Sequence, residues 1–148
     1  MTATAPRLVL DTNVLISALW KPGSVPARAI DALFAYDACV LYDARILAEY
    51  CAVLSRPKFK KIDPTRAAAL IARLVAQGEE VVDVRPWPGA MKDEDDRSFV
   101  EVALTGLATV LVTGNLRDYP QDLGFEVLPP AMLLGTLVSA APPRPFGR

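Results

Sequence analysis

Histidine is absent from the 148-residue sequence, and cysteine occurs only twice, at Cys39 and Cys51. The absence of histidine excludes zinc sites with imidazole ligands, Ser-His-Asp triads and a histidine general base. Two cysteines are too few for the disulfide framework of a small secreted protein, so we expect a reduced, cytoplasmic protein. Carboxylates remain as the side chains available for chemistry.

The sequence also lacks a long apolar run and a surplus of positive charge. No stretch reaches the roughly 18 apolar residues of a membrane span, and residues 1–6 do not resemble a signal peptide, so we expect no membrane attachment. The formal net charge is −1, whereas nucleic-acid binders often carry a basic surplus. Any nucleic acid must therefore be held by a local patch or through bound cations.

The chain is long and apolar enough to bury a substantial core, with 52% hydrophobic residues. We expect one domain over residues 1–138 and a proline-rich, disordered tail at 139–148. Strands are predicted at 7–10, 39–42, 80–85, 109–113 and 125–128. Helices are predicted at 14–20, 26–36, 44–54, 64–77, 95–106 and 131–137. This alternation predicts an α/β fold with a mainly parallel sheet.

Polar side chains follow the first and fourth predicted strands. Asp11 comes directly after the first strand, and Thr113, Gly114 and Asn115 stand at the end of the fourth. Open parallel sheets bind ligands outside the carboxyl ends of their strands, so both strands deliver polar groups to one edge. Asp11 also has a structural alternative, because it can cap a helix that begins near Asn13.

Asp96 lies on the apolar face of the helix predicted at 95–106. At about 100° per residue it shares that face with Phe99 and Ala103, and Asp93, if helical, points the same way, whereas Glu101 points outward. A carboxylate that faces a core costs several kcal/mol unless it is paired or metal-bound. The alternative is that Asp93 and Asp96 cap this helix.

Glu49 borders the apolar stripe of the helix at 44–54, where a solvated surface glutamate is the alternative. Asp11, Glu49 and Asp96 have no basic residue among their inward-facing neighbours, which indicates a bound cation. Hard oxygen ligands suit Mg²⁺ or Mn²⁺ better than zinc. Such sites commonly act on phosphate esters, because the metal neutralises developing charge and activates water.

Four motifs occur in order between residues 7 and 137. They are Asp11-Thr12-Asn13-Val14-Leu15, Ile46-Leu47-Ala48-Glu49-Tyr50 closing with Leu54-Ser55-Arg56-Pro57-Lys58-Phe59, Asp93-Glu94-Asp95-Asp96, and Leu111-Val112-Thr113-Gly114-Asn115 followed by Asp118-Tyr119. In this order they resemble the PIN-domain nucleases, most closely the subgroup described as toxin components of bacterial toxin–antitoxin systems.

The resemblance implies a three-layer α/β/α domain, an endoribonuclease that cuts single-stranded RNA with Mg²⁺ or Mn²⁺, frequent homodimers and a small antitoxin protein as partner. The family's metal-ligand positions fall on Asp11, Glu49 and Asp96, and Asp93 matches an additional acidic position. Its fourth acidic position falls on Asn115, and Asp118 is the alternative fourth ligand. An amide oxygen can coordinate Mg²⁺ but brings no charge, so a second metal position would lack one charge.

Four further residues are candidates for substrate contact. Thr113 and Asn13 are expected to line the same site, and Arg56 and Lys58 belong to the densest basic segment of the chain, residues 56–66. Such a segment can contact RNA phosphates, although a solvated loop is the alternative. Trp20 and Trp87 are able to stack on bases, but we expect both to be packing or interface residues.

Two other functions stay open. A haloacid-dehalogenase-like phosphatase also has Asp after its first strand, but it needs a second Asp two residues later, where this chain has Asn13. Its acidic pair follows the threonine motif, whereas the pair at 95–96 precedes Thr113. A domain that binds RNA or protein without cutting is the other alternative, although such relatives usually lose one of the carboxylates, and here all three are present.

Overall fold

The centre of the fold is a five-stranded parallel sheet with the order β3-β2-β1-β4-β5. The computed structural model describes residues 5–140, and their side chains as far as residue 137. The strands are β1 (Arg7–Leu10), β2 (Cys39–Tyr42), β3 (Glu79–Glu80), β4 (Val110–Val112) and β5 (Glu126–Leu128). The central strands are short apolar runs, as expected for strands buried on both faces.

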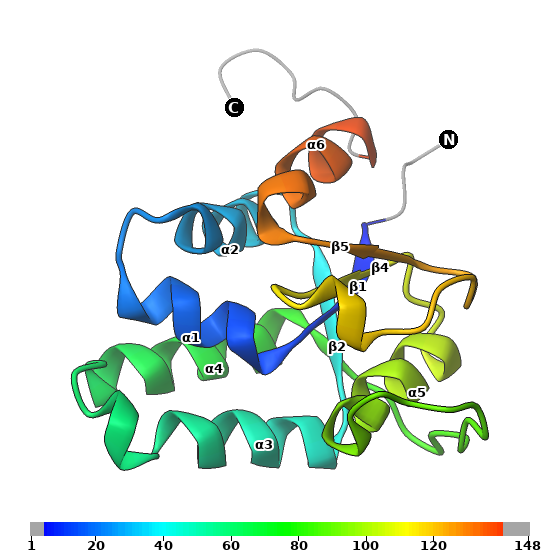
Figure 1. Cartoon of the computed structure of the whole chain (residues 1–148). Coiled ribbons are helices and arrows are strands. Elements are labelled where there is room, and N and C mark those ends of the chain that lie inside the picture. The colour runs from blue at the N-terminus through cyan, green and yellow to red at the C-terminus, as the bar shows by residue number, and fades with distance from the viewer. Residues whose placement is uncertain (1–4, 141–148) are drawn as a thin grey trace.

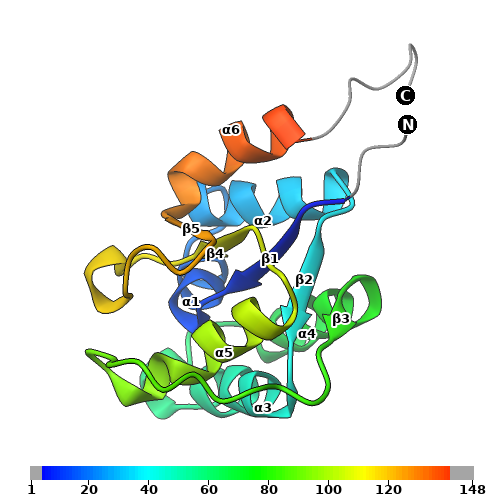
Figure 2. The same ribbon diagram turned by 90° about the vertical axis from the view of Figure 1, so that its right-hand side faces the viewer.

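Helices cover both faces of this sheet. They are α1 (Thr12–Trp20), α2 (Val25–Ala35), α3 (Ala44–Leu54), α4 (Pro64–Gln77), α5 (Arg97–Thr105) and α6 (Pro130–Ala140), with 3-10 turns η1 (Pro57–Phe59), η2 (Glu94–Asp96) and η3 (Leu116–Asp118). Figures 1 and 2 show α2 and α6 together on one side of the sheet and α3, α4 and α5 on the other. The predicted three-layer α/β/α architecture is therefore confirmed.

The helices begin and end where local side-chain chemistry predicts. Ser24, Asp43 and Asp63 each accept a hydrogen bond from a backbone N–H in the first turn of α2, α3 and α4, and each such cap stabilises by about 1 kcal/mol. The helix α4 stops at Gly78, where a Cβ would lie 2.3 Å from the carbonyl oxygen of Val40. Glycine is required there because the chain passes so close to β2.

The strand order reverses between β1 and β4. After β1, the chain adds β2 and β3 on one side, and β4 and β5 come later on the other. Leu10 pairs with Val112 in register, so Asp11 and Thr113, which follow these strands, emerge next to each other. The crevice at such a reversal is where open α/β sheets bind ligands.

The predicted strand at 80–85 is wrong, because β3 comprises only Glu79 and Glu80. The backbone N–H of Val81 still donates to the carbonyl oxygen of Tyr42 at 2.7 Å. Asp83 then adopts a positive φ of 54°, which is incompatible with an extended strand. The following residues form a loop that leads to η2.

Two helix boundaries also differ from the prediction. The segment expected to be one helix at 95–106 consists of η2 followed by α5, and α6 continues to Ala140. Of the predicted tail at 139–148, the first two residues therefore continue α6, and the rest lies outside the described residues. Between residues 5 and 140, no helix has the length and apolar character that crossing a bilayer requires.

Candidate active site

Asp11 directly follows β1, beside the carboxyl end of β4, and is only 6% exposed. Its backbone N–H donates to the carbonyl oxygen of Val112 at 2.9 Å, so the β1–β4 ladder extends to this residue. The hydroxyls of Thr113 and Tyr119 donate to its Oδ2 at 2.9 and 2.8 Å, and the N–H of Asn13 donates to Oδ1 at 3.3 Å. Asp11 therefore does cap α1, but it also receives two buried hydroxyls that a cap does not need.

Burial raises the pKa of Asp11 above its ordinary value, and the charge of Asp118 adds to the rise. The hydrogen bonds from Tyr119, Thr113 and Asn13 oppose this rise without cancelling it. Each of these donors is neutral. The chain thus orients this carboxylate without supplying a positive charge to compensate it.

Asn13 links α1 to the loop after β4. Its Oδ1 accepts the backbone N–H of Gly114 at 3.0 Å, and its Nδ2 donates to the hydroxyl of Thr113 at 3.4 Å. The backbone N–H of Asn115 donates to that same hydroxyl at 3.0 Å. Asn13 and Thr113, predicted as substrate contacts, are thus engaged with the protein itself, where they position Asp11.

Glu49 projects from the partly buried face of α3 and accepts a hydrogen bond from the hydroxyl of Thr12. Burial raises its pKa, and the charges of Asp11 and Asp95 raise it further, whereas Thr12 and Arg56 lower it. Thr12 was not singled out from the sequence, although its position directly after Asp11 is a usable signal. Through Thr12, the first turn of α1 connects the carboxylates of Asp11 and Glu49.

Asp96 stands at the junction of η2 and α5, partly buried and without a side-chain capping bond. Its pKa is raised to about 7, first by burial and then by the charges of Asp11, Asp93, Asp118 and Glu49. Asp93 differs, because its side chain accepts the N–H of Asp95 at 3.0 Å and caps η2. The capping alternative therefore describes Asp93 but not Asp96.

Of the two candidates for a fourth ligand, Asn115 directly precedes η3 and Asp118 is its last residue. Asn115 is exposed and makes no side-chain capping bond, whereas Asp118 is half-buried and its charge raises the pKa values of Asp11 and Asp96. Lys92 approaches Asp118, with 3.7 Å between Nζ and Oδ1. Of the two, Asp118 is the residue whose charge reaches the other carboxylates.

These side chains form an acidic cluster, which we define as Asp11, Glu49, Asp96 and Asp118. Asp11 directly follows β1, Glu49 lies on α3, and Asp96 and Asp118 are the last residues of η2 and η3. Among the described residues no three acidic or cysteine side chains are arranged, as they stand, to hold one metal ion, and no ion pair engages Asp11, Glu49 or Asp96. The donor set nevertheless fits a hard divalent cation, because it offers carboxylate oxygens whose mutual repulsion such an ion would relieve.

The predicted phosphate contacts differ in their relation to this cluster. Arg56 is exposed and its charge lowers the pKa of Glu49, so it lies within electrostatic reach of the site. Lys58 lies over the ring of Phe59, 5.0 Å from its centroid. Trp87 packs as expected, since the guanidinium of Arg97 lies 5.7 Å from the centre of its ring.

Glu101 does not point outward as predicted but is 6% exposed. Its Oε1 pairs with Arg45 at 2.8 Å, and its Oε2 accepts the N–H of Trp87 at 2.9 Å. The prediction failed because it assumed solvent on that face of α5, whereas the loop after β3 covers it and also bonds Thr105 through the N–H of Arg85. Tyr119 was likewise not identified as a partner of Asp11.

Comparisons with known proteins identify the family and the fold. The PIN domain family matches residues 7–117, well over half of the chain. An uncharacterized protein from Methanocaldococcus jannaschii is 28% identical over 110 residues, which cover 74% of this chain and 70% of that protein. A chain in the crystal structure of VapBC2 from Rickettsia felis, bound to a DNA fragment from their promoter, superposes with a TM-score of 0.55 and 16% identity, over 82% of this chain and 98% of that one.

The similarity to VapBC2 is one of fold, while the family match rests on the sequence itself. PIN domains are generally nucleases, and PIN nucleases generally use divalent metal ions. The matched range contains Asp11, Glu49, Asp96 and Asn115, and it ends one residue before Asp118. This chain belongs to the PIN-domain family.

Proposed function

We propose that this protein is an endoribonuclease that cuts single-stranded RNA with Mg²⁺ or Mn²⁺ and acts as the toxin of a toxin–antitoxin pair. The observation that carries the proposal is the acidic cluster, where burial and neighbouring carboxylates raise the pKa values of Asp11, Glu49 and Asp96, and within the described residues no ion-paired cation engages these three. A fold does not leave charges uncompensated in this way for stability, so the arrangement supports a binding role for them.

Asp11, Glu49 and Asp96 would hold the ion, and Asp118 or Asn115 would complete its ligands. A bound Mg²⁺ or Mn²⁺ would neutralise charge on the scissile phosphate and lower the pKa of water. The protein's own contribution is orientation. Thr113 and Tyr119 fix Oδ2 of Asp11, and Thr12 holds Glu49.

Partner and oligomer belong to the same proposal. The motifs resemble toxin components, and the fold resembles a chain of VapBC2, which supports a small antitoxin encoded next to this protein. Co-expression with the neighbouring reading frame should yield a complex without nuclease activity. Light scattering on the isolated protein should show a homodimer, and a monomer at all concentrations would remove that part of the proposal.

The decisive experiment is a cleavage assay on single-stranded RNA, with Mg²⁺, with Mn²⁺ and with a chelator. Wild-type protein should cut RNA only with metal. Asp96→Asn should lose more than about 100-fold in activity, because residues that only hydrogen-bond to metal ligands typically contribute 10- to 100-fold. Asp31→Asn on α2 is the matched control, since it removes an exposed carboxylate outside the cluster. Circular dichroism should show that both variants fold.

Three outcomes separate the alternatives. Equal activity of Asp96→Asn and wild type, in metal and in chelator, would refute the hydrolase. Binding of RNA without cleavage under any metal would favour the non-catalytic alternative. Cleavage of single-stranded DNA in preference to RNA would show that DNA is the substrate. The family match leaves the haloacid-dehalogenase-like phosphatase without support.

A further inference from the structure

An exposed tryptophan stands at the end of α1. Trp20 is 51% exposed, although a side chain of this size is usually largely buried. Its ring meets Phe59 of η1 edge to face, with 6.2 Å between the ring centres and 83° between the planes. A hollow of about 360 Å³ opens beside this pair, and its lining includes Lys21 and Pro26. The edge contact occupies only part of the indole, so a face remains open to solvent.

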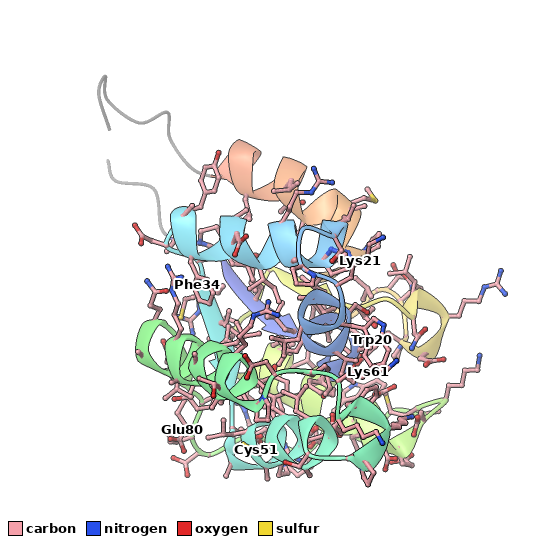
Figure 3. The ribbon with its side chains drawn as sticks, turned by 90° about the vertical axis from the view of Figure 1, so that its left-hand side faces the viewer. Trp20, Lys21, Phe34, Cys51, Lys61 and Glu80 are labelled. Atoms are coloured by element: carbon pink, nitrogen blue, oxygen red, sulfur yellow. The ribbon has the colours of Figure 1, made fainter. Side chains whose placement is uncertain are left out.

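Positive charge surrounds this aromatic pair. The exposed cations are Lys21, Arg56, Lys58, Lys60 and Lys61. Figure 3 shows Trp20, Lys21 and Lys61 at the same end of the molecule, where α1 ends near the turn between α3 and α4, and Figure 1 places these segments together as well. Among the described residues, none of the five cations forms an ion pair, whereas Arg7, Arg45, Lys92 and Arg97 do. Their charge is therefore available to an anionic partner.

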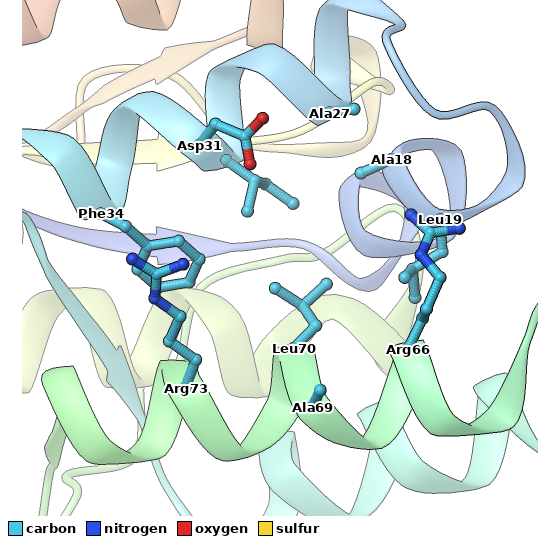
Figure 4. A pocket seen from close by; sticks show the side chains of 10 residues that line it. Ala18, Leu19, Ala27, Asp31, Phe34, Arg66, Ala69, Leu70 and Arg73 are labelled. Atoms are coloured by element: carbon cyan, nitrogen blue, oxygen red, sulfur yellow. The ribbon is translucent and has the colours of Figure 1, made fainter.

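A second group of cations, Arg66 and Arg73, lines a cavity together with a carboxylate. Figure 4 shows a cavity of about 320 Å³ between α2 and α4, with Arg66 and Arg73 on one side and Asp31 on the other. Arg73 lies 4.0 Å from the centre of the Phe34 ring and donates to Gln77. This cavity contains its own carboxylate, Asp31, which repels an anionic strand, so it fits such a strand less well.

The helix α1 connects the exposed tryptophan to the acidic cluster. Asp11 caps its first turn and Trp20 is its last residue, so the two are separated by roughly 13 Å at 1.5 Å per residue. That separation corresponds to about four nucleotides at the roughly 3.4 Å rise of stacked bases. The charge of Arg56, three residues before Phe59, reaches Glu49. A strand that reaches the carboxylates can therefore also reach Trp20.

We propose that Trp20, Phe59, Lys21, Arg56, Lys58, Lys60 and Lys61 form a Trp20 platform that binds single-stranded RNA, stacking a base on Trp20 and holding phosphates with the cations. The proposal deepens the proposed function and rests on it. Stacking on aromatic rings flanked by cations is how proteins hold unpaired strands without reading their sequence. It fits RNA better than an antitoxin peptide because five unpaired cations favour a polyanion.

Tryptophan fluorescence tests the stacking directly, because the chain has only two tryptophans. In an Asp96→Asn background, which keeps the RNA intact, Trp87→Phe leaves Trp20 as the only tryptophan, and Trp20→Phe leaves Trp87. A short single-stranded RNA should quench the first protein and leave the second unchanged. Quenching of the second alone, or binding by anisotropy with no quenching of Trp20, would overturn the proposal.

Affinity variants then measure the contribution of the platform. Trp20→Ala should bind RNA about five- to a hundredfold more weakly, whereas Trp20→Phe should retain most of the affinity. Met132→Ala is the matched control, since Met132 is an exposed large apolar side chain on α6. Equal RNA affinity of Trp20→Ala and wild type would overturn the proposal and would leave a protein as the occupant of this surface.

The salt dependence of binding tests the charges. Lys60→Gln/Lys61→Gln should reduce the slope of log K against log salt by about 0.7 for each lost phosphate contact, and Arg28→Gln/Arg85→Gln, which also removes two exposed cations, should leave it unchanged. The same slope for both double variants would contradict the platform. Because binding is measured without cleavage, a failed platform and a failed nuclease assignment give different results.

Discussion

Asp11 and Glu101 are two carboxylates with the same burial and opposite chemistry. Each is 6% exposed. For Glu101, burial alone would raise the pKa, but the hydrogen bond from Arg45, the N–H of Trp87 and the charge of Arg97 outweigh it, so the pKa is lowered. For Asp11, the donors are neutral and burial prevails, so the pKa is raised.

The surroundings of Glu101 and of Asp11 differ in where the compensating positive charge comes from. Arg45 and Glu101 join α3 to α5, and the N–H of Trp87 ties the covering loop to the same carboxylate. That network supplies both signs of charge from within the chain. Asp11, Glu49 and Asp96 form no ion pair among the described residues, and in the proposed function a bound cation supplies the positive charge. Charge compensation therefore distinguishes a structural carboxylate from a functional one better than burial does.

Exchanging the charge for an amide in each region should give opposite results. Asp11→Asn should lose cleavage by more than a hundredfold while keeping or increasing the free energy of unfolding, because it removes a repelling charge. Glu101→Gln should keep cleavage, but it should lower the free energy of unfolding by about 1–3 kcal/mol, since its amide leaves Arg45 or Trp87 without an acceptor. Urea unfolding and RNA cleavage on both variants measure this. The reverse pattern would mean that the two roles have been exchanged.

Tyr119 sharpens the comparison, because it is the neutral donor that takes the place of a cation at Asp11. Tyr119→Phe keeps the buried ring and removes the hydroxyl that donates to Oδ2. Cleavage should fall by about 10- to 100-fold, with about 1 kcal/mol of stability lost. That bond lowers the pKa of Asp11, so its loss should move the acid limb of the pH–rate profile to higher pH.

The shift of the acid limb distinguishes positioning from packing. Tyr36→Phe, which removes a hydroxyl at the end of α2, is the control and should change neither rate nor profile. A Tyr119→Phe variant that loses stability but keeps its rate and pH profile would show that this residue only packs.

The features that the sequence predicted are those set by nearby residues. Asp11 and Thr113 follow apolar strands, and the helix caps lie next to the turns that they close, so spacing alone locates them. The contact between Tyr119 and Asp11 joins residues 108 positions apart and depends on the β1–β4 register and the turn of η3. No local pattern encodes such a contact.

The predictions that failed depend on what covers an element. The outward direction of Glu101 was inferred from helical phase, but the loop after β3 occupies the space where solvent was assumed. The strand at 80–85 was inferred from valines, whereas the left-handed conformation of Asp83 ends it. Sequence periodicity gives the direction of a side chain, and the tertiary fold decides what it meets there.

The acidic cluster should also make the metal-free protein less stable as pH rises. The pKa of Asp96 is raised from 3.8 to about 7, so between these values the folded state binds more protons than the unfolded state and the free energy of unfolding falls with increasing pH. Burial is the largest cause of this raised pKa, and the charges of Asp11, Asp93, Asp118 and Glu49 add to it. The destabilising effect of the Asp96 charge is thus smallest at the acidic end of this window.

Asp96→Asn removes this dependence. In a chelator its Tm should exceed that of wild type by a few degrees above pH 7, and the two should converge near pH 4. Added Mg²⁺ should narrow the difference, because the ion compensates the same charge in wild type. Parallel curves of Tm against pH for Asp96→Asn and wild type would show that the pKa of Asp96 is not raised in the folded state.

Asn115→Asp is expected to have the smallest effect, since the side chain is exposed and its charge would be screened. If the new carboxylate stays roughly 8 Å from the ion without ligating it, their attraction in water is about 1 kcal/mol, so Mn²⁺ affinity should rise roughly fivefold. Wild-type protein should bind one ion weakly or none without RNA, because no three ligands among the described residues are already gathered and Mg²⁺ keeps several waters.

Calorimetric titration with Mn²⁺ distinguishes the two possible fourth ligands. If Asn115 is the position that lacks a charge, Asn115→Asp strengthens binding and Asp118→Asn changes it little. If Asp118 has taken over that role, Asp118→Asn weakens binding and Asn115→Asp has no effect. The electrostatics of the free protein favour Asp118 as a metal ligand, because its charge reaches both Asp11 and Asp96. Lys92, at 3.7 Å, competes with the metal ion for this carboxylate. Lys92→Gln should then tighten Mn²⁺ binding only in a protein that retains Asp118. An equal gain in Mn²⁺ affinity in the Asp118→Asn background would show that Lys92 repels the ion through its charge alone.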